Sequence, residues 1–282
     1  MVIMAIGAIL TKEGVTKILN AQKLGHSFVL VSLDLGKSVE KVNLEKNFVI
    51  IRGQKINFSE LKKVKENTLY TIEDDSLKSI DFFSQETNIF YKLTPTKDWP
   101  TLTFSSVPMH RFKTISPKLS AELMVKEISP IQGIVLDTCC GLGYTSILEA
   151  KTAEEVIVFE KDENVIRIAE YNPYSEELFT NKKIKLKQES VLEGIKLLKK
   201  DSFDRILHDP PTVSFEKELY SKEFYSELFR VLKPKGIIYH YCPNPGKTKG
   251  TEFFPSIIKH LKETGFRNCE HHKESSGIRA TK

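Results

Sequence analysis

Two short acidic turns hold the residues of this chain that are best suited to chemistry. In the first, Asp137 closes an apolar run at residues 134–136, and Gly141 and Gly143 follow before a stretch of helix-forming composition. The glycines lack the Cβ atoms that would keep a ligand off the backbone, and the first N–H groups of the helix point into the same space. We therefore expect a nucleotide-like ligand over this turn. The predicted ligand contacts are Asp137, Cys139, Gly141, Gly143, Tyr144 and Thr145.

Two kinds of ligand compete for the first turn, and a simple chain reversal without a ligand is the third interpretation. A dinucleotide site needs a third glycine where this sequence has Ser146, and a carboxylate at the start of the turn would repel a diphosphate. The pattern Asp-x-Cys-x-Gly-x-Gly resembles the first motif of class I S-adenosylmethionine (AdoMet) methyltransferases. This resemblance implies S-adenosyl-L-methionine as the cofactor, because a carboxylate attracts its sulfonium cation.

Further acids and polar residues follow the next two predicted strands. Glu160 ends the apolar run at residues 156–159, about 20 residues after Asp137, where a doubly wound fold places a carboxylate that accepts both ribose hydroxyls. A solvated surface acid would show the same pattern. Lys161 is also predicted to contact the cofactor; the alternative is that it only begins the next helix. Glu189 and Ser190, after the third strand, are assigned to the adenine amino group, with ordinary loop residues as the alternative.

The second acidic turn is His208-Asp209-Pro210-Pro211, after the fourth apolar run at residues 203–207. The prolines hold the chain extended and remove two N–H donors, so carbonyl oxygens there face a ligand without internal competition. Asp209 and a neighbouring carbonyl form an acceptor pair that would orient an exocyclic NH₂ group toward the sulfonium methyl. We predict that His208, Asp209, Pro210 and Pro211 are catalytic and that Asp209 also borders the cofactor. A rigid loop with a scaffold histidine is the structural alternative.

The composition is that of a soluble globular protein. The chain has 282 residues, of which 40% are hydrophobic and 28% charged, a net charge of +5, and no apolar run that could span a membrane. The apolar opening, Met1–Leu10, lacks a basic leader and is expected to be a buried strand. Four cysteines without a C-x-x-C pair predict a cytoplasmic protein without a structural metal.

Two patterns of elements divide the chain. Residues 1–112 hold short apolar runs between turn formers and are predicted to be an N-terminal β-rich domain for substrate recognition. Residues 113–282 alternate strands with helices, which predicts an α/β fold with a doubly wound, Rossmann-like parallel sheet. Ligands of such sheets bind outside the carboxyl ends of the strands, where both acidic turns are expected.

Several motifs together resemble a narrower family. Segments that include Pro108-Met109-His110-Arg111, Phe159-Glu160-Lys161 and His208-Asp209-Pro210-Pro211 look like the predicted archaeal methyltransferase family with an H-D-P-P motif, whose members are associated with ribosomal RNA. The resemblance implies methylation of an amine at Asp209. The chain departs from the usual amino-methyltransferase signature at Thr212, where an aromatic ordinarily stacks on the flipped base, so Phe215 or Tyr220 would have to supply that surface.

The remaining predicted site residues would contact the substrate. Arg111 is expected to meet a phosphate, with an interdomain salt bridge as the alternative, and Tyr241 ends the fifth strand at the same edge as the two turns. The predicted substrate contacts are His110, Arg111, Thr212, Phe215, Tyr220 and Tyr241.

The leading hypothesis is an AdoMet-dependent N-methyltransferase that acts on an exocyclic base amine of RNA, cytidine N4 in ribosomal RNA, with RNA or a ribosomal particle as its partner. A methyltransferase for a protein amide or a small-molecule amine fits the same acceptor loop. A polyamine-synthase-like aminopropyl transferase is less expected, because D-P-P is a poor general-base arrangement for a cationic amine. The alternative outside enzymes is a non-catalytic RNA-binding assembly factor that keeps an AdoMet pocket.

Overall fold

A computed structural model describes residues 7–242 and 253–282, and it divides into two compact units. Unit 1 consists of Met1–Pro117 together with Asn164–Glu176, and unit 2 consists of Lys118–Glu163 together with Glu177–Lys282. The first six residues of the predicted opening strand lie outside the described residues; of the rest, Leu10 forms an isolated bridge with Tyr70. The predicted division into domains between residues 112 and 113 stays a prediction.

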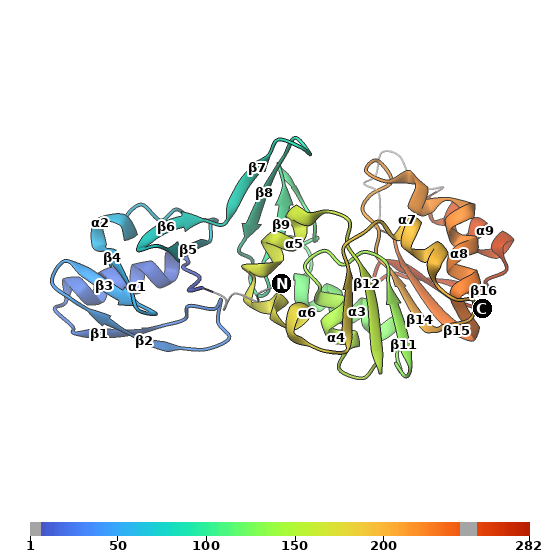
Figure 1. Ribbon diagram of the computed structural model, residues 1–282, viewed down its shortest axis with the longest axis horizontal. Helices are drawn as coiled ribbons and strands as arrows, with labels where there is room; N and C mark the ends of the chain where they lie inside the picture. The colour runs from blue at the N-terminus through green and yellow to red at the C-terminus, as the bar shows by residue number, and fades with distance from the viewer. Residues whose placement is uncertain (1–6, 243–252) are drawn as a thin grey trace. The chain divides into compact units, whose positions relative to one another are not determined.

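The first part of unit 1 is a helix packed on an antiparallel sheet (Figure 1). Helix α1, Lys12–Lys23, begins after Thr11, whose side chain accepts a hydrogen bond from the Gly14 N–H. Its buried residues share a core with alternate residues of the sheet, which is why one face of the sheet is apolar. The strands follow in the order β1 (Phe28–Val31), β2 (Glu40–Leu44), β3 (Phe48–Ile51) and β4 (Gln54–Asn57).

The second part of unit 1 contains a short helix, α2 (Phe58–Leu61), the hairpin β5–β6 and a second antiparallel sheet. The segment that returns from later in the sequence, with α5 (Glu163–Glu170) and the short helix η1 (Pro173–Ser175), packs here, since the Tyr171 hydroxyl donates to Glu73 at 3.1 Å. The strands are β5 (Tyr70–Glu73), β6 (Ser76–Ser79), β7 (Asp81–Ser84), β8 (Ile89–Thr94), β9 (Thr101–Phe104) and β10 (Val107–Pro108), and the second sheet has the order β10-β9-β8-β7.

Unit 2 is built on a seven-stranded sheet within the described residues, in the order β13-β12-β11-β14-β15-β17-β16. The pairs from β13 to β15 are parallel, whereas β17 is antiparallel to both β15 and β16. The strands are β11 (Ile134–Asp137), β12 (Glu155–Phe159), β13 (Ile184–Lys187), β14 (Phe203–His208), β15 (Leu232–Tyr241), β16 (Arg267–His272) and β17 (Gly277–Thr281).

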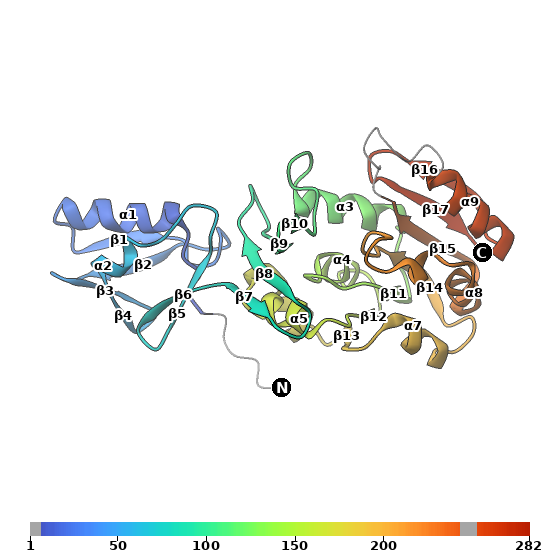
Figure 2. The ribbon, with the colours of Figure 1, turned by 90° about the horizontal axis from the view of Figure 1, so that it is seen from above.

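Helices of unit 2 cover the sheet. A large apolar core joins α7, α8 and α9 to β14 and β15, and Figures 1 and 2 show α8 and α9 side by side. Helix α4 packs against β11 and β12. The helices are α3 (Pro117–Glu127), α4 (Tyr144–Glu149), α6 (Glu176–Thr180), α7 (Val191–Gly194), α8 (Lys222–Val231) and α9 (Phe253–Thr264), with short 3₁₀ turns η2 (Ile195–Leu197) and η3 (Lys217–Tyr220).

The predicted α/β, Rossmann-like fold of the C-terminal part is confirmed. The expectation of a purely parallel sheet is wrong at one edge, because the last two strands form a hairpin that pairs with β15 in the antiparallel sense. The strand order reverses at β11, since the chain runs outward through β12 and β13 and then returns to place β14 on the other side of β11. Ligands of doubly wound sheets bind at such a reversal.

Candidate functional site

The two acidic turns meet where the strand order reverses. Asp137, at the end of β11, pairs in register with Leu207 of β14, and the Thr138 N–H donates to the Leu207 carbonyl at 3.0 Å. His208 and Asp209 therefore follow directly beside the first turn. Residues about seventy positions apart in sequence are brought together here by the parallel pairing of β11 with β14.

The Asp137 carboxylate is buried and used by its own turn. It accepts hydrogen bonds from the hydroxyls of Thr145 and Ser146, both at 2.7 Å, and from the Cys139 N–H at 3.3 Å. Its side chain is 0% exposed, and burial raises its pKa to about 6. Asp137 and Thr145 thus fix the glycine turn to the start of α4, and a direct ligand contact by either stays a prediction.

The backbone of the first turn has few N–H groups to offer to an anion. Most of them donate to protein acceptors over 2.8–3.3 Å. A phosphate or carboxylate ligand needs such donors, whereas a cation does not. The bonded pairs are Thr138 with Leu207, Cys139 with Asp137, Cys140 with Phe159, Gly141 with Glu160, and Gly143 with Cys140.

The two glycines of the turn adopt the left-handed conformation, with φ of 55° at Gly141 and 77° at Gly143. A Cβ atom on Gly143 would lie 2.8 Å from a methyl carbon of Leu178. A side chain at this position would collide with Leu178, so close packing within the protein also requires a glycine here, and the contact of Gly143 with a ligand stays a prediction. Tyr144, the first residue of α4, is buried, with 3% of its surface exposed.

The Glu160 carboxylate caps the same turn from β12. Its Oε2 accepts the Gly141 N–H at 3.0 Å and its Oε1 accepts the Asp162 N–H at 2.9 Å. Burial raises the pKa of Glu160 to about 7. A carboxylate has about four lone-pair sites, so two hydroxyl donors can still bind it. Its neighbour Lys161 forms an ion pair with Glu216 at 2.7 Å, which links the loops that follow β12 and β14.

The acceptor loop after β14 is held by a tyrosine. Pro210 is buried, and the Pro211 carbonyl accepts a hydrogen bond from the Tyr220 hydroxyl at 2.9 Å. Asp209 is half-buried. Burial is the largest cause that raises the pKa values of Cys139, Tyr220 and Cys242, and the charge of the nearby Asp209 raises all three further.

His208 is a buried link between the two turns. Its Nε2 lies 3.0 Å from the Leu219 carbonyl and must donate to it, so its Nδ1 accepts from the Thr138 hydroxyl at 2.7 Å. Burial holds the pKa of His208 well below its ordinary value, and the ring of His240 lies at 4.4 Å from its own. Both nitrogens are thus occupied by protein partners. This arrangement indicates that His208 positions the loop rather than touching a substrate.

The remaining predicted site residues have varied places. Thr212 and Phe215 are exposed in the loop after Pro211, and Tyr241 is half-buried at the end of β15. Glu189 is exposed, and the Ser190 hydroxyl caps α7 by accepting the Leu192 N–H. His110 and Arg111 belong to unit 1, where His110 bonds to Thr101 through its Nδ1 at 2.9 Å. The substrate or cofactor contacts predicted for all of these residues stay predictions.

Sequence reasoning missed several residues that build this site. Thr138 and Leu178 support the first turn, and His240 accepts the Tyr225 hydroxyl at 2.9 Å beneath the second. The sequence predicts residues 239–243 as a strand end whose aromatic residues line the pocket or simply pack, and Pro243 lies outside the described residues. A polar residue directly after an apolar strand, as at Thr138, was the available signal.

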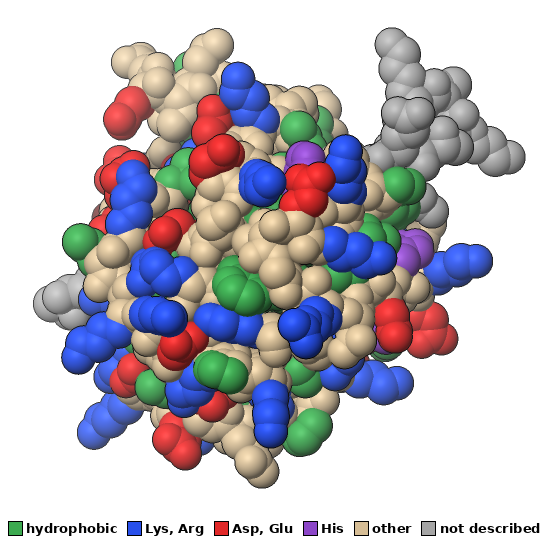
Figure 3. All heavy atoms as spheres, turned by 90° about the vertical axis from the view of Figure 1, so that its right-hand side faces the viewer, with side chains coloured by type: hydrophobic (Ala, Val, Ile, Leu, Met, Phe, Trp, Pro, Cys, Tyr) green, Lys and Arg blue, Asp and Glu red, His purple; other side chains and the backbone are tan. Residues whose placement is uncertain are grey.

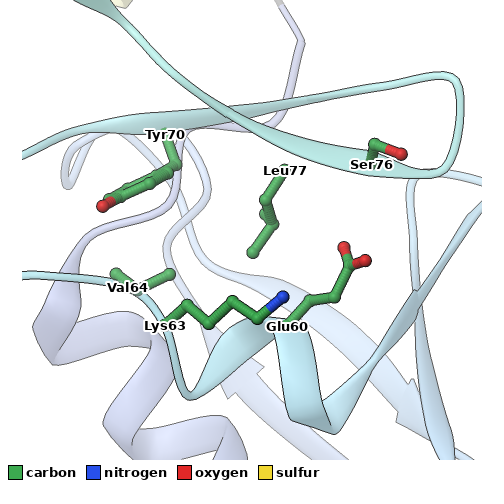
Figure 4. A pocket seen from close by; sticks show the side chains of 6 residues that line it. All are labelled: Glu60, Lys63, Val64, Tyr70, Ser76 and Leu77. Atoms are coloured by element: carbon green, nitrogen blue, oxygen red, sulfur yellow. The ribbon is translucent and has the colours of Figure 1, made fainter.

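Unit 1 has a separate hollow of about 250 Å³, shown in Figure 4. Glu60, Lys63 and Val64 line one side of it, and Tyr70, Ser76 and Leu77 of the β5–β6 hairpin line the other. None of the predicted site residues lies there.

Comparison with known proteins decides the family. The family model described as "Spermine/spermidine synthase domain" matches residues 129–271, which include both acidic turns. The chain belongs to the spermine/spermidine synthase family.

An uncharacterized protein of Methanocaldococcus jannaschii is 36% identical over 281 residues, covering 97% of this chain and 95% of the relative. A polyamine aminopropyltransferase of Oceanobacillus iheyensis is 25% identical, covering 68% of this chain, which spans only 37% of that enzyme. The structure of spermidine synthase from Thermotoga maritima shares the fold, with a TM-score of 0.51 and 16% identity over 71% of this chain and 70% of the other.

The predicted function is therefore wrong. RNA methylation, ribosomal RNA and an RNA partner are contradicted by the family match and by relatives named as polyamine aminopropyltransferases. Neither a methyltransferase for amides or small-molecule amines nor a non-catalytic RNA-binding factor fits this family. The stacking surface expected from Tyr220 is also not offered, because its ring is buried beside His208 and its hydroxyl bonds to Pro211.

The surface carries mixed charges. Figure 3 shows one face on which lysine and arginine side chains are interspersed with acids. Among the ion pairs of the protein, Glu263 is within reach of both Lys222 at 3.4 Å and Lys259 at 3.9 Å. Within residues 7–242 and 253–282, no helix combines the length and apolar character that crossing a bilayer requires.

Proposed function

We propose that this protein is an aminopropyl transferase that moves an aminopropyl group from decarboxylated S-adenosylmethionine to an amine of a small polyamine or diamine. Membership of the spermine/spermidine synthase family supports the reaction class. The polyamine aminopropyltransferases among the relatives support the substrate class.

The observation that carries the proposal is the acceptor-rich character of the site. Most N–H groups of the turn between Thr138 and Gly143 donate to protein acceptors, while the carboxylates of Glu160 and Asp209 border it. A donor that keeps its α-carboxylate would meet these two carboxylates, and the turn itself would offer it few N–H groups in compensation. A decarboxylated donor presents only cationic groups, the sulfonium and the primary ammonium, and these are attracted.

The same charges favour a cationic acceptor. Polyamines are ammonium ions at neutral pH, so a nitrogen must lose a proton before it attacks. In the proposed step this nitrogen attacks the aminopropyl carbon bonded to sulfur, and the carbon–sulfur bond breaks with its electron pair going to sulfur. The nitrogen's proton passes to the Asp209 carboxylate and then to water. The products are a longer polyamine and a neutral adenosyl thioether, and Asp209 and the Pro211 loop supply orientation and charge stabilisation.

The two donors distinguish this function experimentally. The purified chain is incubated with a panel of diamines and polyamines and either decarboxylated S-adenosylmethionine or AdoMet, and products are identified by mass spectrometry. We expect a product lengthened by one aminopropyl group, together with the adenosyl thioether, only with the decarboxylated donor. Methylated product from AdoMet, or no product from any amine, would overturn the proposal.

A further inference from the structure

The four-stranded sheet of unit 1 has one buried face and one open face. Val31, Val42, Val49 and Ile56 point toward α1 and are at most 2% exposed. Because side chains alternate along a strand, their neighbours point the other way. The open face consists of Phe28, Leu30, Lys41, Asn43, Phe48, Ile50, Lys55 and Asn57.

The open face exposes an unusual amount of apolar surface. Phe28 is 44% exposed, Leu30 59% and Ile50 37%. Phe28 and Leu30 are neighbours on this face of β1, and the strand register places Ile50 on the far side of Asn43 from Phe28. Exposed apolar side chains gathered on one face, with polar residues among and around them, mark interaction surfaces.

The charges on this face are all positive. Lys41 Nζ lies 4.5 Å from the centroid of the Phe28 ring, and Lys55 Nζ lies 4.1 Å from that of Phe48. Within the described part of the chain neither ammonium forms an ion pair, and the open face has no acid among its residues. The complementary surface therefore carries carboxylates beside apolar side chains.

One of three kinds of partner fits the open face. A second copy docked through the same face would set lysines against lysines. Nucleic-acid bases need open aromatic faces for stacking, but here the ammonium groups of Lys41 and Lys55 lie over the rings of Phe28 and Phe48. We propose that the open face binds an acidic amphipathic helix of a partner protein, whose apolar stripe covers Leu30 and Ile50 and whose carboxylates pair with the two lysines.

The test uses the full chain and a labelled probe helix that has a leucine stripe flanked by glutamates, with binding followed by fluorescence anisotropy. Wild type should bind this probe, and the double exchange Lys41→Glu/Lys55→Glu should weaken binding by at least about tenfold, because it sets like charges against each other. The matched control is Lys62→Glu/Lys65→Glu, which makes the same change in net charge at exposed lysines outside the open face. It should bind the probe nearly as the wild type does, and all three proteins should keep the same transferase activity.

Several results would overturn the inference. Equal weakening in both double variants would mean that only net charge matters. Absence of binding to the wild type at millimolar probe would exclude the helix. A concentration-dependent dimer that Leu30→Asp disrupts would assign the face to a second copy, and retention of a single-stranded oligonucleotide that Lys41→Glu/Lys55→Glu abolishes would assign it to nucleic acid.

Discussion

The hydroxyl of Tyr220, the last residue of η3, donates to the Pro211 carbonyl at 2.9 Å and so links this turn to the loop that carries Asp209. Tyr220→Phe removes this one hydrogen bond, and we expect a stability loss of about 1 kcal/mol. Because the loop then loses a constraint next to Asp209, the aminopropyl-transfer rate should also fall. Tyr174→Phe is the control, since it removes a similarly half-buried hydroxyl that donates to the Leu35 carbonyl at 3.0 Å within unit 1. The two variants should lose similar stability, and only the first should lose rate; equal rates would contradict a positioning role for Tyr220.

Asp209 is predicted to be the residue on which turnover depends most. Asp209→Asn keeps the shape of the side chain but removes the charge that attracts the ammonium and accepts its proton, so we expect the transfer rate to fall by about 10²- to 10⁴-fold. Binding of the donor, measured by calorimetry, should be weakened far less. Glu154→Gln changes an exposed acid just before β12, at the opposite end of that strand from Glu160, and should act as wild type. Near-normal turnover by Asp209→Asn would remove Asp209 from the mechanism.

Gly143→Ala should destabilise the protein for two separable reasons. An alanine at φ 77° costs about 1–2 kcal/mol, and its methyl group would also collide with Leu178. The comparison is Gly53→Ala, because Gly53 has φ 82° and no atom lies within 4 Å of the place its new methyl group would take, so it should show only the backbone cost. Combining Gly143→Ala with Leu178→Ala should cost less than the sum of the single changes in urea unfolding, and strict additivity would argue against the collision.

Glu149 should make stability fall as the pH rises. Its side chain is 0% exposed, neither carboxyl oxygen has a hydrogen-bond partner in the described structure, and burial raises its pKa well above the ordinary value. Above the unfolded pKa, the unfolded chain gives up this proton while the folded chain keeps it, so the free energy of unfolding declines with pH. Glu149→Gln should therefore be more stable than wild type at neutral pH, and this advantage should vanish in acid. Glu154→Gln, at an exposed position, should show no such trend.

The two buried histidines should act in the opposite direction. Burial lowers the pKa of His208 well below its ordinary value and that of His240 to about 4. As the pH falls below about 6.5, the unfolded chain takes up protons that the folded chain refuses, so stability is lost in acid. The slope of the free energy of unfolding against pH gives the number of protons taken up on unfolding. In acid, His208→Gln should lower this number by up to one relative to wild type. An unchanged pH slope would mean that His208 is protonated in the folded protein.

Much of the fold could be predicted from the sequence. Strand ends marked by an acid, as at Asp137 and Glu160, and the helix start at Ser116-Pro117 place the elements of unit 2 close to their observed bounds. Helix α1 was missed, although Thr11 as its cap and the spacing of Val15 and Ile18 carried the signal. The β16–β17 hairpin was expected as two strands, but its antiparallel pairing depends on tertiary contacts that no local pattern reveals.

The chemistry was harder to predict than the site. The pattern around Asp137, Glu160 and Asp209 predicts a cationic S-adenosyl donor at one sheet edge, and transfer of either a methyl or an aminopropyl group would begin from that same arrangement. From the sequence alone an aminopropyl transferase is less expected, because Asp209-Pro210-Pro211 is a poor general base for a cationic amine, and this judgement considered only proton removal. It left out attraction: carboxylates gathered at a turn with few available N–H donors would attract an ammonium before any proton moves.

The pairing of β11 with β14 also bears on how the enzyme is made. During translation the ribosome releases Asp137 and the glycine turn long before it releases Asp209, because β12, α5 and β13 come between them. A nascent chain that ends before β14 lacks the parallel neighbour of β11 and the acceptor loop together. The acceptor loop of the proposed enzyme can therefore join the glycine turn only late in synthesis, when the returning strand pairs with β11.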